Sequence, residues 1–294
     1  MIRAALDWVI WPLVVLASIA SAHALLARGV PALLVTPIAV GAIAGIVALL
    51  ERLHPERAGV PRDYPLWQEA AHFVFDFEVG YGLSLAACEL VGRGARAVLP
   101  IPAWPTHWPV ALQILVAVLV YEGTSYWQHR ALHAFPSLWR FHALHHSGAR
   151  LDFTRAVRFH AVDIGTASFV AYAPLVIFAA PDELFARMGV LLSALGILQH
   201  ANVRMRTPRW LGRLVCTPAV HRHHHSAVRA EGDTNYGNTV MLFDLLFGTF
   251  GDPPRPIPET IGITGDPVPK DFLGQLFGPF RRSRSRTIHR DPSR

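Results

Sequence analysis

The chain has 294 residues, of which 52% are hydrophobic and 16% charged, with a formal net charge of +6. Typical soluble domains carry about 25% charged residues, and the mean hydropathy here is +0.30. Because several uncharged runs also approach or exceed the roughly 20 residues that cross a bilayer, the composition indicates an integral membrane protein. It excludes a disordered chain and a disulfide-rich secreted domain. The positive charge fits the excess of arginine on the cytoplasmic face of membrane proteins and does not indicate nucleic-acid binding.

Six apolar segments predict four to six membrane helices. The first segment is too long for a cleaved signal peptide and leads directly into the second. The third is weaker because it contains Asp76, Glu78 and Glu89. The last two flank a Pro-Asp-Glu turn at 181–183 and predict a tight hairpin, either spanning or re-entrant. The six segments are 8–27, 29–50, 70–91, 109–121, 164–181 and 188–203.

If each segment crosses the membrane, one side receives the N-terminus, 51–66, 129–160 and everything after about 201. That side holds all but four of the 27 Lys and Arg residues. The positive-inside rule makes it cytoplasmic. The four exceptions are Arg28, Arg93, Arg96 and Arg187.

The chain is predicted to form a single membrane-embedded domain over 1–280, followed by a basic, solvated tail over 281–294. A membrane-surface or nucleic-acid role for this tail is the alternative. Cys88 and Cys216 are the only cysteines and form no CxxC pattern. The sequence therefore indicates neither a disulfide framework nor a thiolate metal site.

Eleven of the 16 histidines lie between positions 129 and 225, and eight of these form three boxes. The spacing is i, i+4 in the first box and i, i+3, i+4 in the other two, which places each box on one helix face. Neutral imidazole suits Fe, Zn, Cu and Ni. Eight imidazoles are too many for one ion, so we predict two metals with about four imidazoles each. The boxes contain His129 and His133; His142, His145 and His146; and His221, His224 and His225.

Two further histidines are expected at the same membrane face, His200 in QHAN and His160 in RFH. His223 points off the face that its box shares, so we expect it not to bind metal. An isolated histidine usually binds no metal. We therefore expect no metal-binding role for five others: His23, His54, His72, His107 and His289.

Six stretches together resemble the fatty acid hydroxylase/sterol desaturase superfamily, which comprises integral-membrane, non-haem di-iron enzymes. Their order and spacing both match, and the likeness covers nearly the whole chain. The last stretch looks most similar to bacterial sterol-desaturase-like proteins and alkylglycerol monooxygenases. The resemblance implies an all-α membrane fold with a cytoplasmic helical cap around a dinuclear, histidine-rich centre in a bacterial inner membrane. The stretches are YWQHRALH (126–133), LWRFHALHHS (138–147), LDFTRAVRFH (151–160), QHANVR (199–204), HRHHHS (221–226) and DTNYGNTVMLFDLLFGTF (233–250).

The resemblance makes ten histidines metal ligands: the eight of the boxes, His200 and His160. The proline that commonly follows the last of these is Ala161 here. Glu122 stands where the family often has an aspartate, and we expect it to accept the second N–H of a ligand imidazole. Asp244 is expected either to support a ligand or to cap a helix. The expected supporting residues are Glu122, Asn202, Asp233, Asn235 and Asp244.

The activity implied is O2-dependent hydroxylation of a membrane lipid by two iron ions, with desaturation or ether cleavage as alternatives. The candidate substrates are a sterol or hopanoid, a fatty acyl chain, an ether lipid and a carotenoid. The chain lacks a Gly-rich dinucleotide motif and a CxxCH haem site, so electrons are expected from a separate ferredoxin or cytochrome. Arg150, Arg155 and Arg229 are predicted to steer that acidic donor.

Three other functions compete with this one. A membrane zinc hydrolase would use fewer histidines and a general-base carboxylate, as in HExxH, which the sequence lacks. A metal transporter would place its ionisable residues within the spans, whereas these histidines lie at helix ends. A non-catalytic relative would be expected to have lost ligands.

Overall fold

The computed structural model describes residues 2–253, 260–265 and 268–281. Within these residues the chain is helical, and pairing between extended segments is limited to isolated bridges such as Pro55 with Val203. The predicted all-α fold is therefore confirmed. The predicted basic tail, apart from Arg281, and His289 lie outside the described residues.

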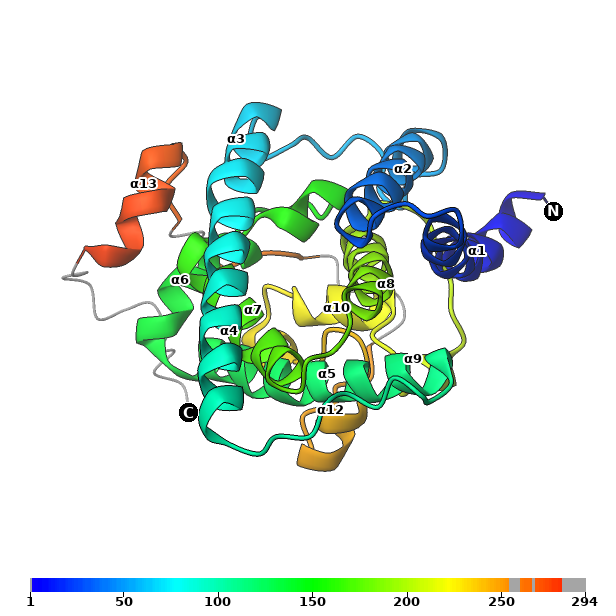
Figure 1. The fold of residues 1–294 in the computed structure, drawn as a ribbon. Helices are drawn as coiled ribbons and strands as arrows, with labels where there is room; N and C mark the ends of the chain where they lie inside the picture. Colours follow the sequence, from blue (N-terminus) through cyan, green and yellow to red (C-terminus); the bar gives the residue numbers. More distant parts are fainter. Residues whose placement is uncertain (1, 254–259, 266–267, 282–294) are drawn as a thin grey trace.

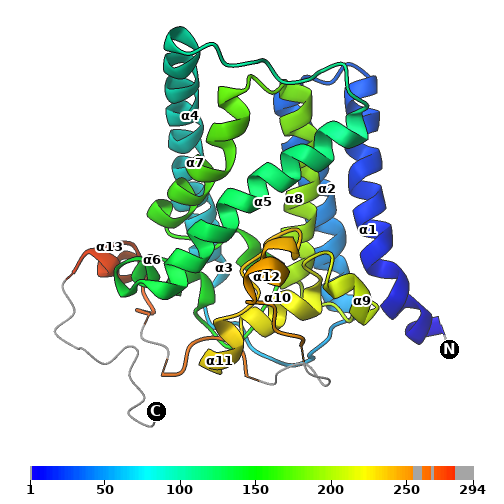
Figure 2. The same cartoon turned by 90° about the horizontal axis from the view of Figure 1, so that it is seen from below.

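Six long helices stand side by side and carry the chain back and forth between two ends of the molecule (Figures 1 and 2). The third is extended at its start by the short helix α3 (Leu66–Ala71) and a π-helical stretch, His72–Glu78. Among the described residues, α1, α2 and α5 are long and apolar enough to cross a membrane, and α7 is a shorter apolar helix. The six are α1 (Ile2–Ala27), α2 (Ala32–Leu53), α4 (Val79–Val98), α5 (Val110–Ala134), α7 (Ala161–Ile177) and α8 (Asp182–His200).

One of the three acidic residues that weakened the third predicted segment is paired inside the protein. Asp76 is fully buried, and its Oδ2 lies 2.5 Å from Nδ1 of His72 on the preceding turn. Its other oxygen accepts the backbone N–H of Ala161 at the start of α7. A buried carboxylate needs such partners, so this charge serves helix packing.

Helices α4 and α7 approach each other closely because α4 has glycine at the contact. A Cβ at Gly80 would lie 2.8 Å from the carbonyl oxygen of Ala161 and from Cγ2 of Ile164. Small residues permit this kind of backbone approach between membrane helices. The contact fixes the start of α7, which carries a residue of the site described below.

Buried apolar side chains form two main clusters on either side of α8. One joins α1 and α2 to the C-terminal part of α8, with Val35, Val47 and Leu198 fully buried. The other joins α4, α5 and α7 to the start of α8 around Leu175 and Met188. The central position of α8 leaves its last residue, His200, buried at one end of the bundle.

Short helices form a cap at the end of the bundle where α5 and α8 finish (Figure 2). The turns α1–α2 and α7–α8 lie at the opposite end, as the predicted alternation of the segments requires. Arg28 lies in the first of these turns, and Arg187 follows the second. The cap helices are α6 (Pro136–His146), α9 (Arg209–Gly212), α10 (Pro218–His224), α11 (Arg229–Gly232), α12 (Leu242–Phe247) and α13 (Phe272–Phe277).

Candidate metal centre

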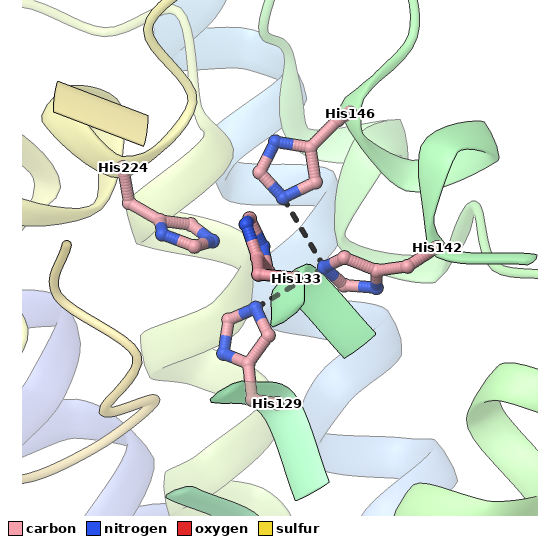
Figure 3. Close-up of side chains that lie close together, drawn as sticks. All are labelled: His129, His133, His142, His146 and His224. Carbon is pink, nitrogen blue, oxygen red and sulfur yellow. Dashed lines mark hydrogen bonds between the residues drawn. The ribbon is translucent and has the colours of Figure 1, made fainter. Parts of the chain in front are cut away.

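Nine buried histidines gather into two groups beneath the bundle, and within each group one nitrogen from every ring lies within 4.8 Å of the others. The five-histidine group contains His129, His133, His142, His146 and His224 (Figure 3). The four-histidine group contains His145, His200, His221 and His225. The prediction of two sites with about four imidazoles each agrees with this arrangement.

The second and third boxes are each divided between the groups in the same way. In the second box, His142 and His146 join the five-histidine group while His145 joins the other. In the third, the pair four residues apart, His221 and His225, joins the four-histidine group, and His224 crosses to the five-histidine group. Residues i and i+4 point nearly the same way on a helix, whereas i+3 is rotated from both. Each group therefore receives a pair from one box and a single ring from the other.

Local sequence sets the helices that carry these boxes. Pro136 and Pro218 occupy the first positions of α6 and α10, where a missing N–H costs nothing. The first box lies on the last two turns of α5. The short segment from His200 to Val203, which bridges to Pro55, then leaves α8 in extended form.

Two rings of the five-histidine group are held by carboxylates. Nδ1 of His142 lies 2.8 Å from Oδ2 of Asp163, which is itself 2% exposed. Nδ1 of His133 lies 3.3 Å from Oδ1 of Asp233, the supporting residue that the sequence predicted. A carboxylate accepts a hydrogen bond from Nδ1–H, which keeps the proton on Nδ1. Nε2 of each ring therefore presents its lone pair to the group.

Two other rings of this group donate to backbone carbonyls. Nδ1 of His129 lies 2.8 Å from the oxygen of Tyr236, and Nδ1 of His224 lies 2.8 Å from that of Thr234. A carbonyl only accepts, so these rings also carry their proton on Nδ1. The loop 234–236 thereby fixes the orientation of rings from two separate helices.

The four-histidine group is oriented mainly by backbone. Nδ1 of His200 donates to the oxygen of Gly196 at 2.7 Å, and Nδ1 of His145 donates to that of Arg158 at 3.3 Å. The His145 ring also stacks on Phe159 with centroids 4.1 Å apart. Backbone carbonyls and an aromatic ring therefore hold the imidazoles of His200 and His145 in fixed orientations.

The ring nitrogens that face one another are arranged for a cation. Nε2 of His129 lies 3.1 Å from Nε2 of His142, although both rings keep their proton on Nδ1. Nε2 of His145 and His200 face each other in the same way at 3.3 Å. Two lone pairs at this distance repel unless a positive ion lies between them. About 3 Å is the separation expected for neighbouring nitrogens with metal bonds of about 2.1 Å.

Two further observations fit a metal in these groups. The buried Nε2 atoms of His133 and His224 have no hydrogen-bond partner among the described residues. Burial, followed by neighbouring imidazoles, lowers the pKa of His146 and His225 well below the usual value. The rings are therefore neutral, which is the form that binds metal.

Glu122 does not contact an imidazole, contrary to the prediction. Its carboxylate accepts the backbone N–H groups of Asn238, Thr239 and Val240 at 2.7, 2.7 and 3.2 Å. The same loop, at Tyr236, supplies the carbonyl that accepts a hydrogen bond from Nδ1 of His129. Glu122 therefore supports the orientation of the His129 ring indirectly, through this loop.

Asp244 holds the same loop from the other side. It accepts the N–H groups of Tyr236 and Gly237 at 2.9 and 2.7 Å, and the hydroxyl of Thr249 at 2.7 Å. Of the two roles predicted for Asp244, support of the loop that contacts His129 is the one that this geometry favours. The sequence contained no spacing that would reveal the shared target of Glu122 and Asp244.

The two predicted asparagines contact backbone rather than imidazole. Asn202 exchanges hydrogen bonds with both backbone groups of Arg57. Asn235 does the same with Gly251 and adopts a left-handed conformation, with φ of 58°. Asn tolerates that region better than most residues. Both therefore shape loops around the centre.

His160 is the one predicted ligand that lies outside both groups. Its Nδ1 accepts the N–H of Val162 and caps α7, while Nε2 donates to the oxygen of Leu276. Both nitrogens are thus used by backbone. His223 also lies outside both groups, as predicted, and the isolated His54 pairs with Asp7 at 2.7 Å.

Sequence reasoning missed Asp163. It lies three residues beyond His160 but 21 residues from its partner His142, so no helical spacing connects it with that histidine. The start of α7 beside α6 brings them together. An acidic residue in the first turn of a helix that follows a histidine motif was the available signal.

These features define an all-α membrane protein with two buried groups of histidines, each of which could hold a metal ion. The chain belongs to the fatty acid hydroxylase family: the family profile "Fatty acid hydroxylase" matches residues 114–249, which contain all ten predicted ligands, and a curated relative is 37% identical over 98% of this chain. The resemblance found in the sequence is thereby confirmed. No solved structure gave a significant match.

Curated relatives support the same family. An ornithine lipid hydroxylase, OlsE from Rhizobium tropici, is 37% identical over 301 residues, covering 98% of this chain and 88% of the relative. Human alkylglycerol monooxygenase is 30% identical over 128 residues, which cover 42% of this chain and 27% of that protein. The Caenorhabditis elegans enzyme of the same name is 28% identical over 162 residues, with 53% and 30% covered. The likeness to alkylglycerol monooxygenases is thus confined to part of each chain.

Proposed function

We propose that this protein is an O2-dependent, di-iron hydroxylase of a membrane lipid. The observation that carries the proposal is the pair of buried histidine groups, in which rings with protonated Nδ1 direct their free Nε2 atoms at one another. Imidazole-only sites without thiolate suit iron as well as zinc and copper. Family membership favours iron.

When bound, two iron ions would supply the reduction of O2 and the oxidation of an unactivated C–H bond. The chain supplies the rest. The five-histidine and four-histidine groups would each hold one ion, and Asp163 and Asp233 would keep the ligand rings in the binding tautomer. Burial of every ligand ring excludes bulk water from the reacting region.

The proposed substrate class is supported by the position of the centre and by a relative that aligns with almost the whole chain. His133 lies in the last turn of α5 and His200 ends α8, at the end of the bundle that the short helices cap (Figure 2). We therefore expect a lipid in the surrounding bilayer to reach the groups from the side. The relative that covers 98% of this chain is an ornithine lipid hydroxylase. We therefore propose an ornithine lipid, or another lipid with an amino-acid headgroup, ahead of sterols, hopanoids, fatty acyl chains and ether lipids.

We further propose that the metal end faces the cytoplasm and takes electrons from a separate ferredoxin or cytochrome. Among the residues that the structure describes, the cap end carries most of the basic side chains, which favours a cytoplasmic position under the positive-inside rule. One predicted steering residue is corrected, because Arg155 is 3% exposed and pairs with Asp63. Arg229 is well exposed beside Asp233 and remains suited to that role.

Lipid analysis tests the activity. The wild-type protein and His133→Ala would be produced in a bacterium that makes ornithine lipid, and grown under isotopically heavy O2. We expect an ornithine lipid that has gained one heavy oxygen atom with the wild type only. An unchanged lipid profile, or an oxygen derived from water, would contradict the proposal.

A further inference from the structure

A small cavity of about 20 Å³ lies on the capped end, beside the four-histidine group, and three arginines line it. These are Arg57, Arg150 and Arg222, and Asn202 completes the polar wall. A cavity of this size holds one small group rather than a chain, since a single water needs about 10–15 Å³.

The cavity is built from segments that also carry the ligands. Arg222 directly follows His221, and Asn202 lies two residues after His200. The Arg150 segment begins a few residues beyond His145. Anything bound here is therefore held next to the four-histidine group by three of the segments that form it.

Arg222 is a buried cation that no carboxylate of the described residues pairs with. Arg222 is 6% exposed, its Nη2 donates to the oxygen of Ala201, and no carboxylate lies within ion-pair distance of it in the described part of the chain. Arg57 lies close enough to repel it, while Glu56, the acid that attracts it, pairs with Arg204 at 3.8 Å. Burying a cation without a partner is costly.

The other two arginines are held in place at the rim. Asn202 bonds both backbone groups of Arg57. Nη1 of Arg150 donates to the oxygen of Val60 at 2.7 Å, and its Nε lies 3.4 Å from Asp152, whose carboxylate Arg62 also shares. The backbone of Arg57 and the side chain of Arg150 are thus held in place beside the buried guanidinium of Arg222.

We propose that this cavity binds the oxyanion of a lipid headgroup, a carboxylate or a phosphate, and so anchors the substrate beside the metal centre. Guanidinium groups pair with both oxyanions through two parallel hydrogen bonds. The cavity is too small for a segment of an acidic protein. The lipid source of the anion rests on the proposed function, whereas the anion site itself rests on the three arginines.

Direct binding to the purified full-length protein in detergent tests the site. The probes are an N-acyl ornithine with a free carboxylate, its methyl ester and inorganic phosphate, each measured by calorimetry. We expect the free acid to bind at least about tenfold more tightly than the ester, because the ester lacks the charge that the arginines pair with. Equal affinity for acid and ester would overturn the proposal. If phosphate binds as tightly as the free acid and displaces it, the anion comes from solution and the headgroup assignment is wrong.

Three variants locate the binding. Arg222→Gln, Arg150→Gln and Arg57→Gln are each expected to weaken binding of the free acid about tenfold and to leave binding of the ester unchanged. The latter two residues are only partly buried, so they report even if Arg222→Gln fails to fold. Arg209→Gln, an exposed arginine paired with Asp252, is the matched control and should bind as the wild type does. Unchanged binding in both rim variants would contradict the site.

The outcome is separable from that of the proposed function. Binding is measured without turnover, and the metal content of each variant is measured in parallel. A protein that binds the acid through these arginines but hydroxylates no lipid would refute the proposed activity and retain the anion site. If the protein hydroxylates lipid but the three substitutions change neither KM nor binding of the acid, the proposed activity is retained and the anion site is refuted.

Discussion

The carboxylate of Asp163 lies 2.8 Å from Nδ1 of His142, across the junction between α7 and α6. This contact fixes the proton on Nδ1 and leaves Nε2 free toward the five-histidine group. Neither residue is more than 3% exposed, so water does not substitute readily for the carboxylate.

We expect Asp163→Asn to weaken metal binding by about 10- to 100-fold, because an amide can turn its NH2 toward Nδ1 and so favour the wrong tautomer. Competition with a chelator measures the change. Asp182→Asn, an acid in the first turn of α8 at the opposite end, is the control and should retain its metal. Equal metal affinity in both variants would show that the contact does not support the site.

Substitution of Glu122 tests whether the loop 236–240 supports the histidine groups. Glu122→Gln replaces an oxygen that accepts backbone N–H groups of 238–240 with an NH2 group that cannot, and we expect a loss of about 2 kcal/mol or more of stability. A lower Tm in detergent should accompany weaker metal binding, since the loop carries the carbonyl that holds His129. Glu89→Gln, on an exposed part of α4, should change neither quantity. An unaltered Tm for Glu122→Gln would count against this role.

Packing of α4 on α7 predicts a contrast between two neighbouring glycines. Gly80→Ala should destabilise the protein by about 1–3 kcal/mol, because its Cβ would lie 2.8 Å from backbone of Ala161. Gly82→Ala meets nothing within 4 Å and should be neutral or stabilising. Thermal denaturation of both variants decides the matter, and a Gly82→Ala protein that is the less stable of the two would contradict the packing described.

The metal-free protein should lose stability as the pH falls below about 6.5. Burial lowers the pKa of His145, His221 and His224 in the folded state. The unfolded chain therefore takes up protons first, so the stability is complete above the unfolded pKa and declines below it. Tm measured from pH 8 to 5 tests the sign, and His145→Asn should reduce the slope. A Tm that rises on acidification would refute this account.

The sequence predicted which histidines gather better than how they divide between the two groups. Helical spacing identified all eight box histidines, and His200 followed from its place at the end of an apolar segment. The division of adjacent His145 and His146 between two groups depends on the packing of α6 against α10 and α8, which one-dimensional spacing does not contain. Helical geometry did imply that adjacent residues such as His145 and His146 point in directions about 100° apart.

The supporting residues were predicted less well for a related reason. Asp233 was found because it lies in a recognisable motif, whereas Asp163 contacts a ring 21 positions away. Glu122 was correctly placed on the ligand face of its helix, but its partners are backbone groups more than 100 positions away. Contacts of this kind arise from tertiary packing.

The most direct test of two separate metal sites is the iron content of the protein purified from iron-replete membranes. We expect about two iron ions per chain in the wild type, and a loss in both His133→Ala and His145→Ala, which remove a ligand from different groups. His160→Ala should keep its iron, because both of its ring nitrogens contact backbone. One zinc ion or none in the wild type, with no O2 consumed when a reductant is added, would contradict the account and favour a hydrolase or a non-catalytic relative.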